Sequence, residues 1–151
     1  SGVTHDAATV VIKLNPVPRG TDFLAQFFSR LAEKGVTIDI ITQSENEQGQ
    51  QLAFSVTHED LTLTDQVLNE LKLGEDTERI TMEDVAKISI VGVGMRTHPG
   101  VASRFFNVLA RENIDVHLVT TSEIKISAVI DRGNLEKAAV ALHREFELDQ
   151  K

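Results

Sequence analysis

The segment "FFNVLARENIDVHLVTTS", from Phe105 to Ser122, has a second copy in this chain. The copy is "FFSRLAEKGVTIDIITQS", from Phe27 to Ser44, at a constant offset of 78 positions. Both begin with apolar residues at helical spacing and end with alternating apolar and polar residues. Because the offset holds without a gap from Val10 to Ser44, we interpret the chain as a duplicated unit.

Each copy predicts the same elements, namely a strand, a helix, two strands and a second helix. The expected strands are 10–14, 36–40, 51–57 and 78–82 in the first copy, and 87–93, 114–118 and 124–130 in the second. The order β-α-β-β-α-β predicts an α+β fold of two ferredoxin-like units, each with an antiparallel sheet and helices on one face.

The two units are expected at residues 9–83 and 84–151. The second copy ends before it could form a fourth strand. An unpaired sheet edge favours association with other chains. We therefore expect residues 1–8 to add a strand to the second unit, so that the first unit is inserted into the second.

The helices have predicted core faces and predicted ends. Apolar residues recurring every three or four positions place six side chains in the cores: Phe27, Phe28, Leu31, Phe105, Phe106 and Leu109. Gly35 and Asn113 suit left-handed caps after the two helices. At the start of the second copy's helix, His98 is predicted as the N-cap and Pro99 as the first helical residue.

Composition restricts the class of function. The chain has 151 residues, of which 41% are hydrophobic and 25% charged, as in ordinary globular proteins. A net charge of -8 disfavours nucleic acid and anionic lipid as partners. Without cysteines, and with five histidines at no zinc-ligand spacing, we expect no metal and no other cofactor. No apolar run is long enough for a membrane span and no leader is present, which favours a cytoplasmic protein.

The turn at Gly92-Val93-Gly94 precedes a predicted helix. A dinucleotide-binding fingerprint would need a third glycine where Thr97 stands, so the glycines fit a tight turn better. A helix N-terminus can bind a carboxylate through its free N–H groups. Nearby acidic residues could face an ammonium group: Asp39, Glu45, Asp115 and Glu123. They could equally be ordinary solvated residues, and the residues alone leave both interpretations open.

Longer motifs favour one family. The stretch "KISIVGVGMRTHPGVASRFFNVLARENIDVHLVTTSEIKISAVI" (Lys87 to Ile130) and "ALHREFEL" (Ala141 to Leu148) resemble the regulatory region of aspartokinase, a tandem pair of ACT domains. The resemblance covers essentially the whole chain. It implies feedback inhibition by lysine or threonine of the enzyme that phosphorylates aspartate, with a catalytic domain or α subunit as partner. The kinase domain has no counterpart here, so the resemblance implies a regulatory chain without catalytic activity.

The resemblance also implies an effector site. In the family, effectors contact the first ACT domain at the loop after its first strand and at the end of its second strand. The matching residues here are Arg19, Gly20, Thr21, Asp22, Phe23, Leu24, Asp39, Gln43, Ser44 and Glu45. A neighbouring second ACT domain contributes Asn113, Asp115, Val116, Thr121, Ser122 and Glu123. We expect the effector carboxylate at the helix N–H groups and its ammonium group at Asp39, since a carboxylate gives a charge-assisted hydrogen bond.

The residues of the first loop and of the second strand point to different effectors. The run "RGTDFLAQFF" is similar to that of some lysine-inhibited aspartokinases, with Thr21-Asp22 added. Many members have Pro-Gly at that place. Gln43 instead matches members inhibited by lysine plus threonine.

The same residues leave three other functions open and also imply an oligomeric state. The chain could be an ACT-type sensor of another enzyme, or a nucleic-acid-binding module, which would need aromatic residues on its sheet and a basic face. A small phosphatase-like enzyme could use Arg96 and Asn113. The apolar Ile41 and Val119, predicted to face outward, together with the resemblance, imply a homodimer through the ACT domains.

Overall fold

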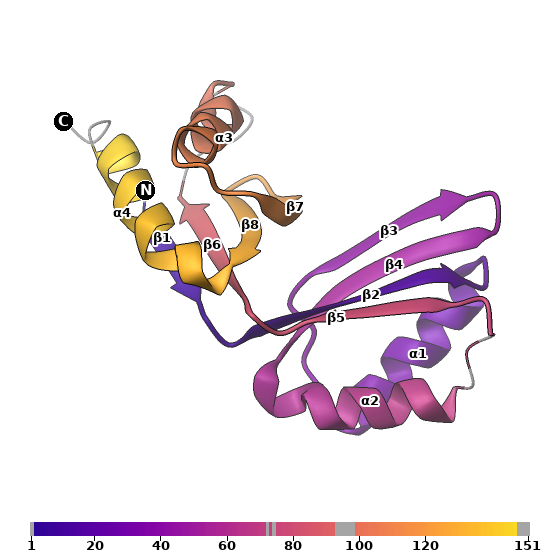
Figure 1. Ribbon diagram of the computed structural model, residues 1–151. Helices are drawn as coiled ribbons and strands as arrows, with labels where there is room; N and C mark the ends of the chain where they lie inside the picture. Colours follow the sequence, from indigo (N-terminus) through magenta and orange to yellow (C-terminus); the bar gives the residue numbers. More distant parts are fainter. Residues whose placement is uncertain (1, 72, 74, 93–98, 148–151) are drawn as a thin grey trace. The chain divides into compact units, whose positions relative to one another are not determined.

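The computed structural model describes residues 2–71, 73, 75–92 and 99–147, and it divides into two compact units (Figure 1). One unit is Ala8–Glu83, and the other combines Ser1–Ala7 with Asp84–Lys151. In the described part, each unit has a four-stranded antiparallel sheet and two α-helices. The predicted α+β class, with two ferredoxin-like units, is confirmed.

The unit Ala8–Glu83 has the strand order β3-β4-β2-β5. Its elements are β2 (Thr9–Val17), α1 (Thr21–Glu33), β3 (Ile41–Asn46), β4 (Gly49–Thr57), α2 (Leu61–Glu70) and β5 (Glu78–Met82), with a 3-10 turn at His58–Asp60. Both helices cover one face of the sheet in Figure 1. Strand β5 has the predicted bounds, and β3 lies at the opposite edge of the sheet.

The other unit has the strand order β1-β6-β8-β7. Its elements are β1 (Gly2–Asp6), β6 (Val85–Val91), α3 (Val101–Arg111), β7 (Val116–Thr121), β8 (Lys125–Asp131) and α4 (Leu135–Glu147), with a 3-10 turn at Arg132–Asn134. Strand β1 pairs antiparallel with β6, and Val3 lies opposite Ile90. This is the pairing expected for the N-terminal segment, and Val3 also packs against the core.

The core of the unit Ala8–Glu83 lies between its sheet and α1 and α2. Alternate residues of β2 point into it, and Val10, Ile12 and Leu14 are all fully buried. The rings of Phe27 and Phe54 meet edge to face with centroids 5.3 Å apart. Every second residue of the strand therefore packs against the apolar face of the helix, as the sequence predicts.

In the core of the second unit, one residue predicted to be buried is partly exposed. Phe105 and Leu109 are buried as predicted, but Phe106 is 37% exposed. Each helical residue turns about 100° from the one before it, so two adjacent phenylalanines cannot both face the sheet directly. Val108, three positions after Phe105, completes the buried stripe instead.

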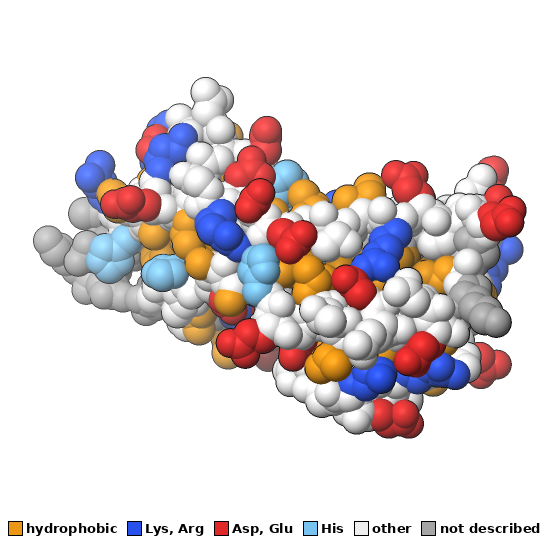
Figure 2. All heavy atoms as spheres, turned by 60° about the horizontal axis from the view of Figure 1, so that its bottom comes forward, with side chains coloured by type: hydrophobic (Ala, Val, Ile, Leu, Met, Phe, Trp, Pro, Cys, Tyr) orange, Lys and Arg blue, Asp and Glu red, His pale blue; other side chains and the backbone are white. Residues whose placement is uncertain are grey.

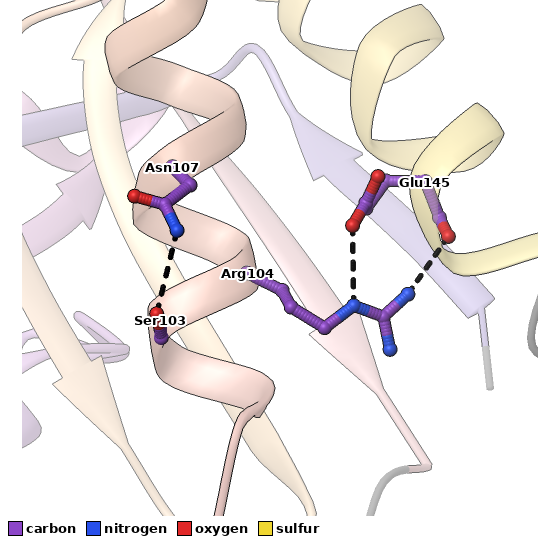
Figure 3. A network of polar contacts seen from close by, with 4 residues as sticks. All are labelled: Ser103, Arg104, Asn107 and Glu145. Carbon is purple, nitrogen blue, oxygen red and sulfur yellow. Dashed lines mark hydrogen bonds and ion pairs between the residues drawn. The ribbon is translucent and has the colours of Figure 1, made fainter.

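A polar contact joins the two helices of this unit (Figure 3). The Nε atom of Arg104 on α3 donates to Oε1 of Glu145 on α4 at 3.2 Å, and its Nη2 atom donates to the Glu145 carbonyl oxygen at 2.9 Å. The guanidinium also lies 4.6 Å from the centre of the Phe146 ring. This side chain thus fixes α3 against α4 beside the apolar core.

Two predicted helix caps are confirmed. Gly35 after α1 has φ 78° and Asn113 after α3 has φ 59°, both in the left-handed region. The predicted start of α3 is wrong, because the helix begins at Val101 and Pro99 lies in a turn. His98, predicted as the cap, lies outside the described residues, as does Val93 of the predicted strand.

The second strand of each copy starts differently from the prediction. Residues 36–40 are outside β3, although the Asp39 N–H donates to the Ser55 carbonyl at 3.2 Å and the Ser55 N–H to the Ile40 carbonyl at 3.0 Å. In β7 the register shifts between Val116 and Leu118. The backbone irregularity in each copy breaks the simple alternation of faces.

This irregularity changes the orientation of two apolar residues. Ile41 lies opposite Phe54 and Val119 lies opposite Ala128, and both partners belong to the helix-covered cores. Directly opposed residues of an antiparallel pair share a face. Ile41 and Val119 therefore belong to the helix side, not the outward face as predicted, yet they remain 52% and 37% exposed at the sheet edges.

Candidate functional site

The loop between β2 and α1 is held against the β3–β4 hairpin. The Arg19 guanidinium donates to the carbonyl oxygens of Asn46 at 2.6 Å and Glu47 at 2.9 Å. In the opposite direction, the side-chain amide of Gln50 donates to the carbonyl oxygens of Pro18 at 2.7 Å and Gly20 at 3.2 Å. These contacts give the loop a defined conformation in front of the helix.

A close backbone approach supports the same loop. Gly49, the first residue of β4, has φ 153°. A Cβ atom at this position would lie 2.5 Å from the Val17 carbonyl oxygen. The turn of the hairpin therefore lies directly against the end of β2, at a distance that only glycine permits.

The N-terminus of α1 carries most of the predicted loop residues. Gly20 is the N-cap residue, and it has no side chain with which to cap the helix. Thr21 and Asp22 are exposed, while Phe23 and Leu24 pack against the core. The first N–H groups of a helix have no intrahelical partner and attract anions. The structure thus leaves an accessible helix N-terminus supported by two partly buried side chains.

A hollow of about 340 Å³ lies beside this helix start. It is formed by the loop, the first turns of α1 and the segment after α2: Pro18, Arg19, Asp22, Phe23, Gln26, Leu71 and Leu73. The lining combines apolar side chains with one basic and one acidic group, a combination that suits a small zwitterion better than a purely apolar ligand.

The end of β3 reaches the loop through one side chain. Gln43, Ser44 and Glu45 are all exposed on this edge strand. The Nε2 atom of Gln43 donates to Oε1 of Gln50 at 2.8 Å. The structure therefore brings the three β3 residues of the predicted site to the same end of the sheet as the loop.

Asp39 lies at the other end of the sheet. Its N–H meets Ser55 of β4, whereas the loop meets Gln50 of the same strand. Five residues of extended chain span about 17 Å. Within a single chain, Asp39 therefore lies too far from this loop to contact the ammonium group of an effector bound there, and its part in a site stays a prediction for a neighbouring chain.

The predicted residues of the second ACT domain form two groups. Asn113, Asp115 and Val116 lie at the start of β7 and line a hollow of about 370 Å³, together with Phe106, Leu109, Ala110 and Ile114. Thr121, Ser122 and Glu123 lie at the other end of β7, where the Ser122 N–H donates to the Lys125 carbonyl oxygen at 2.8 Å. One small ligand cannot contact both groups of the same chain, because the length of β7 separates them.

The described residues can also be compared with the requirements of a charged surface, a metal site and a membrane span. Acidic and basic side chains are interspersed on the face shown in Figure 2. Among the described residues, no group of three or more histidine, aspartate or glutamate side chains could hold a metal ion. Over the same residues, no helix combines the length and apolar character that a membrane span requires.

Gln50 and Gly49 are functional candidates that the sequence did not suggest. The sequence did contain an indication for Gln50, because this residue alternates with Leu52 and Phe54, which are buried on the same strand. A polar residue at an inward-facing position needs buried partners. Here these partners are the carbonyl groups of the loop.

Known proteins with this architecture include regulatory parts of aspartate kinases. The family model described as "ACT domain" matches residues 88–146. The crystal structure of the regulatory subunit of aspartate kinase from Thermus thermophilus superposes with a TM-score of 0.87, at 32% identity over 97% of each chain. This chain belongs to the family of aspartate kinase regulatory regions. The resemblance drawn from the sequence is confirmed.

Two further relatives agree with this family. A chain in the crystal structure of aspartokinase alpha and beta subunits is 30% identical, with a TM-score of 0.85 and coverage of 97% of this chain and 98% of that one. Aspartokinase 2 of Bacillus subtilis is 38% identical over 150 residues, which are 99% of this chain but 37% of the relative. This chain therefore spans little more than a third of the length of that curated relative.

Proposed function

We propose that this chain binds lysine, threonine or both, and thereby transmits feedback inhibition to an aspartate kinase catalytic domain or α subunit. The observation that carries the proposal is 32% identity over 97% of an aspartate kinase regulatory subunit. The accessible N-terminus of α1, beside a loop held by Arg19 and Gln50, supplies a place for an amino-acid carboxylate. An ACT-type sensor of another enzyme, a nucleic-acid module and a phosphatase-like enzyme have less support than this family.

A neighbouring chain can supply a further acidic partner for the ammonium group of the effector, beside Asp22 of the same chain. Strand β3 is a sheet edge in one unit and β7 is a sheet edge in the other. When two edge strands pair antiparallel, the end of one meets the start of the other. Pairing of β3 with β7 of a neighbouring subunit would bring Asn113, Asp115 and Val116 to the loop around Arg19. The hollow at the start of β7 supports this arrangement.

One experiment can test both the binding of the effector and the part of Asp115 as partner of its ammonium group. Calorimetric titration with lysine, threonine and methionine should detect binding of lysine, threonine or both. Asp115→Asn keeps the shape of the side chain and removes its charge. Loss of a hydrogen bond to a charged group should weaken binding roughly tenfold or more.

The control for this titration is Asp76→Asn, at an exposed position before β5, which should bind like the unchanged chain. Titration of Asp39→Asn distinguishes pairing of β3 with β7 from pairing of β3 with a second β3. If Asp39→Asn weakens binding and Asp115→Asn does not, then β3 pairs with a second β3. If neither lysine nor threonine gives a heat of binding, the proposed function itself is contradicted.

The edge-strand arrangement also predicts an assembly. We propose a homodimer as the smallest unit, with β3 in the interface. Ile41→Asp should shift the dimer towards monomer, because it places a charge on an apolar residue that is 52% exposed at this edge. Ile80→Asp on β5, at the opposite edge and 44% exposed, is the matched control and should stay dimeric.

Sedimentation velocity measures this difference directly. A pure monomer of the unchanged chain at micromolar concentration, with and without amino acids, would contradict the dimer. Equal dissociation by both substitutions would instead show that β3 has no special part in the interface.

A further inference from the structure

Gln50 is a buried carboxamide at the start of β4. It is 2% exposed, and it points to the same side of the strand as Leu52 and Phe54 of the core. Burying an amide without hydrogen-bond partners is costly, so the groups around it must satisfy both its donors and its acceptor.

The partners of Gln50 come from two other elements. Its Nε2 atom donates to the carbonyl oxygens of Pro18 and Gly20, at 2.7 and 3.2 Å. Its Oε1 atom accepts from Nε2 of Gln43 at 2.8 Å. Both hydrogens of the amide thus hold the loop before α1, while the oxygen is tied to the edge strand β3.

The two loop carbonyls determine where the next N–H groups point. In a trans peptide the C=O of one residue and the N–H of the following residue lie in one plane and point in opposite directions. With the Pro18 and Gly20 carbonyls turned towards Gln50, the N–H groups of Arg19 and Thr21 are turned away from it. Thr21 is the first residue of α1, so its N–H is one of the free donors at the helix start.

We propose that Gln50 is a positioning residue of the effector site. Its amide orients the two peptide planes so that the N–H groups of Arg19 and Thr21 face the effector carboxylate, and Gln43 links this orientation to the edge strand. The inference rests on the proposed function, in which an amino-acid carboxylate binds at this helix start.

The test uses Gln50→Glu, which keeps the shape and removes both N–H donors. The new carboxylate oxygens would face the carbonyls of Pro18 and Gly20, and Glu45 lies opposite position 50 in the β3–β4 register. The loop peptides should turn away, and the Kd for the effector should rise about fivefold to tenfold. Gln50→Met, which removes the hydrogen bonds without adding charge, should act in the same direction.

The matched control is Gln51→Glu. Gln51 is the next residue of β4, is exposed and points to the other face of the sheet, so this change adds the same charge without touching the loop. Its Kd should stay within about twofold of the unchanged chain.

A second readout needs no effector. In ¹H–¹⁵N spectra, the amide signals of Arg19 and Thr21 should shift in Gln50→Glu and Gln50→Met but not in Gln51→Glu. Folded Gln50 variants with a lower Tm but an unchanged Kd would show a purely structural residue and overturn the proposal. If the unchanged chain binds neither amino acid, the proposed function fails, and unmoved amide signals would still refute the positioning of the loop by Gln50.

Discussion

Phe105→Ala should lower the free energy of unfolding by about 3–5 kcal/mol, as for other fully buried phenylalanines. The ring of Phe105 is 0% exposed and lies in the core between α3, α4 and the sheet. Its removal leaves a cavity among side chains held in place by the sheet and by the Arg104–Glu145 contact. Urea denaturation followed by far-UV circular dichroism measures the change.

The neighbouring phenylalanine is the control for this experiment. Phe106 is 37% exposed, although its ring lies 5.4 Å from that of Phe105. Phe106→Ala removes the same atoms from a partly solvated position and should cost less than about 1.5 kcal/mol. Equal losses for the two substitutions would show that α3 presents a different face to the sheet.

Much of the fold could be predicted because it follows from short-range patterns. The offset between Phe27 and Phe105 shows the duplication, and each copy repeats the periodicity of strand and helix. Gly35 and Asn113 mark helix ends through a backbone conformation that few other residues adopt. The place of β1 follows from a missing fourth strand, because a sheet edge needs a partner or a cover.

The faces of β3 and β7 could not be predicted from the same patterns. Ile38, Ile40 and Ile41 are all apolar, so the sequence does not show where the alternation slips. The slip depends on hydrogen bonds to the backbone and hydroxyl of Ser55, which only the paired strand reveals. A change of one residue in register moves every later side chain to the other face.

The site was predictable in part for a related reason. The residues of the loop and of the end of β3 do come together, because both are close to the β3–β4 hairpin. Asp39 does not, because positions close in sequence on a strand are still separated by more than 3 Å per residue. Gln50 was missed because its hydrogen bonds depend on the carbonyl groups that approach it, and these have no signature in the sequence.

Gly49→Ala is the second change with a large expected effect, about 3 kcal/mol or more of lost stability. One part is the backbone conformation at φ 153°, since such regions cost other residues about 1–3 kcal/mol. The other part is the contact, because the added Cβ would lie 2.5 Å from the Val17 carbonyl oxygen. Backbone on both sides must move, unlike the flexible end of a side chain.

Two other glycines separate these contributions. Gly35 has φ 78° but open space around a Cβ, so Gly35→Ala should cost about 1–2 kcal/mol from conformation alone. Gly133 has open space and no positive φ, so Gly133→Ala should stay within about 0.5 kcal/mol of the unchanged chain. If Gly49→Ala costs no more than Gly35→Ala, the hairpin accommodates the extra atom and does not constrain the loop.

Two of these variants, Gly49→Ala and Gly35→Ala, connect stability to binding. Val17 directly precedes the loop whose carbonyls Gln50 holds, so a shift of its carbonyl would pass to Pro18 and Gly20. Gly49→Ala should therefore raise the Kd for the effector when measured on folded protein, whereas Gly35→Ala should lower stability and leave the Kd unchanged. Loss of binding in both variants would mean that affinity follows the stability of the whole unit, and the close approach at Gly49 would then have no separate part in shaping the site.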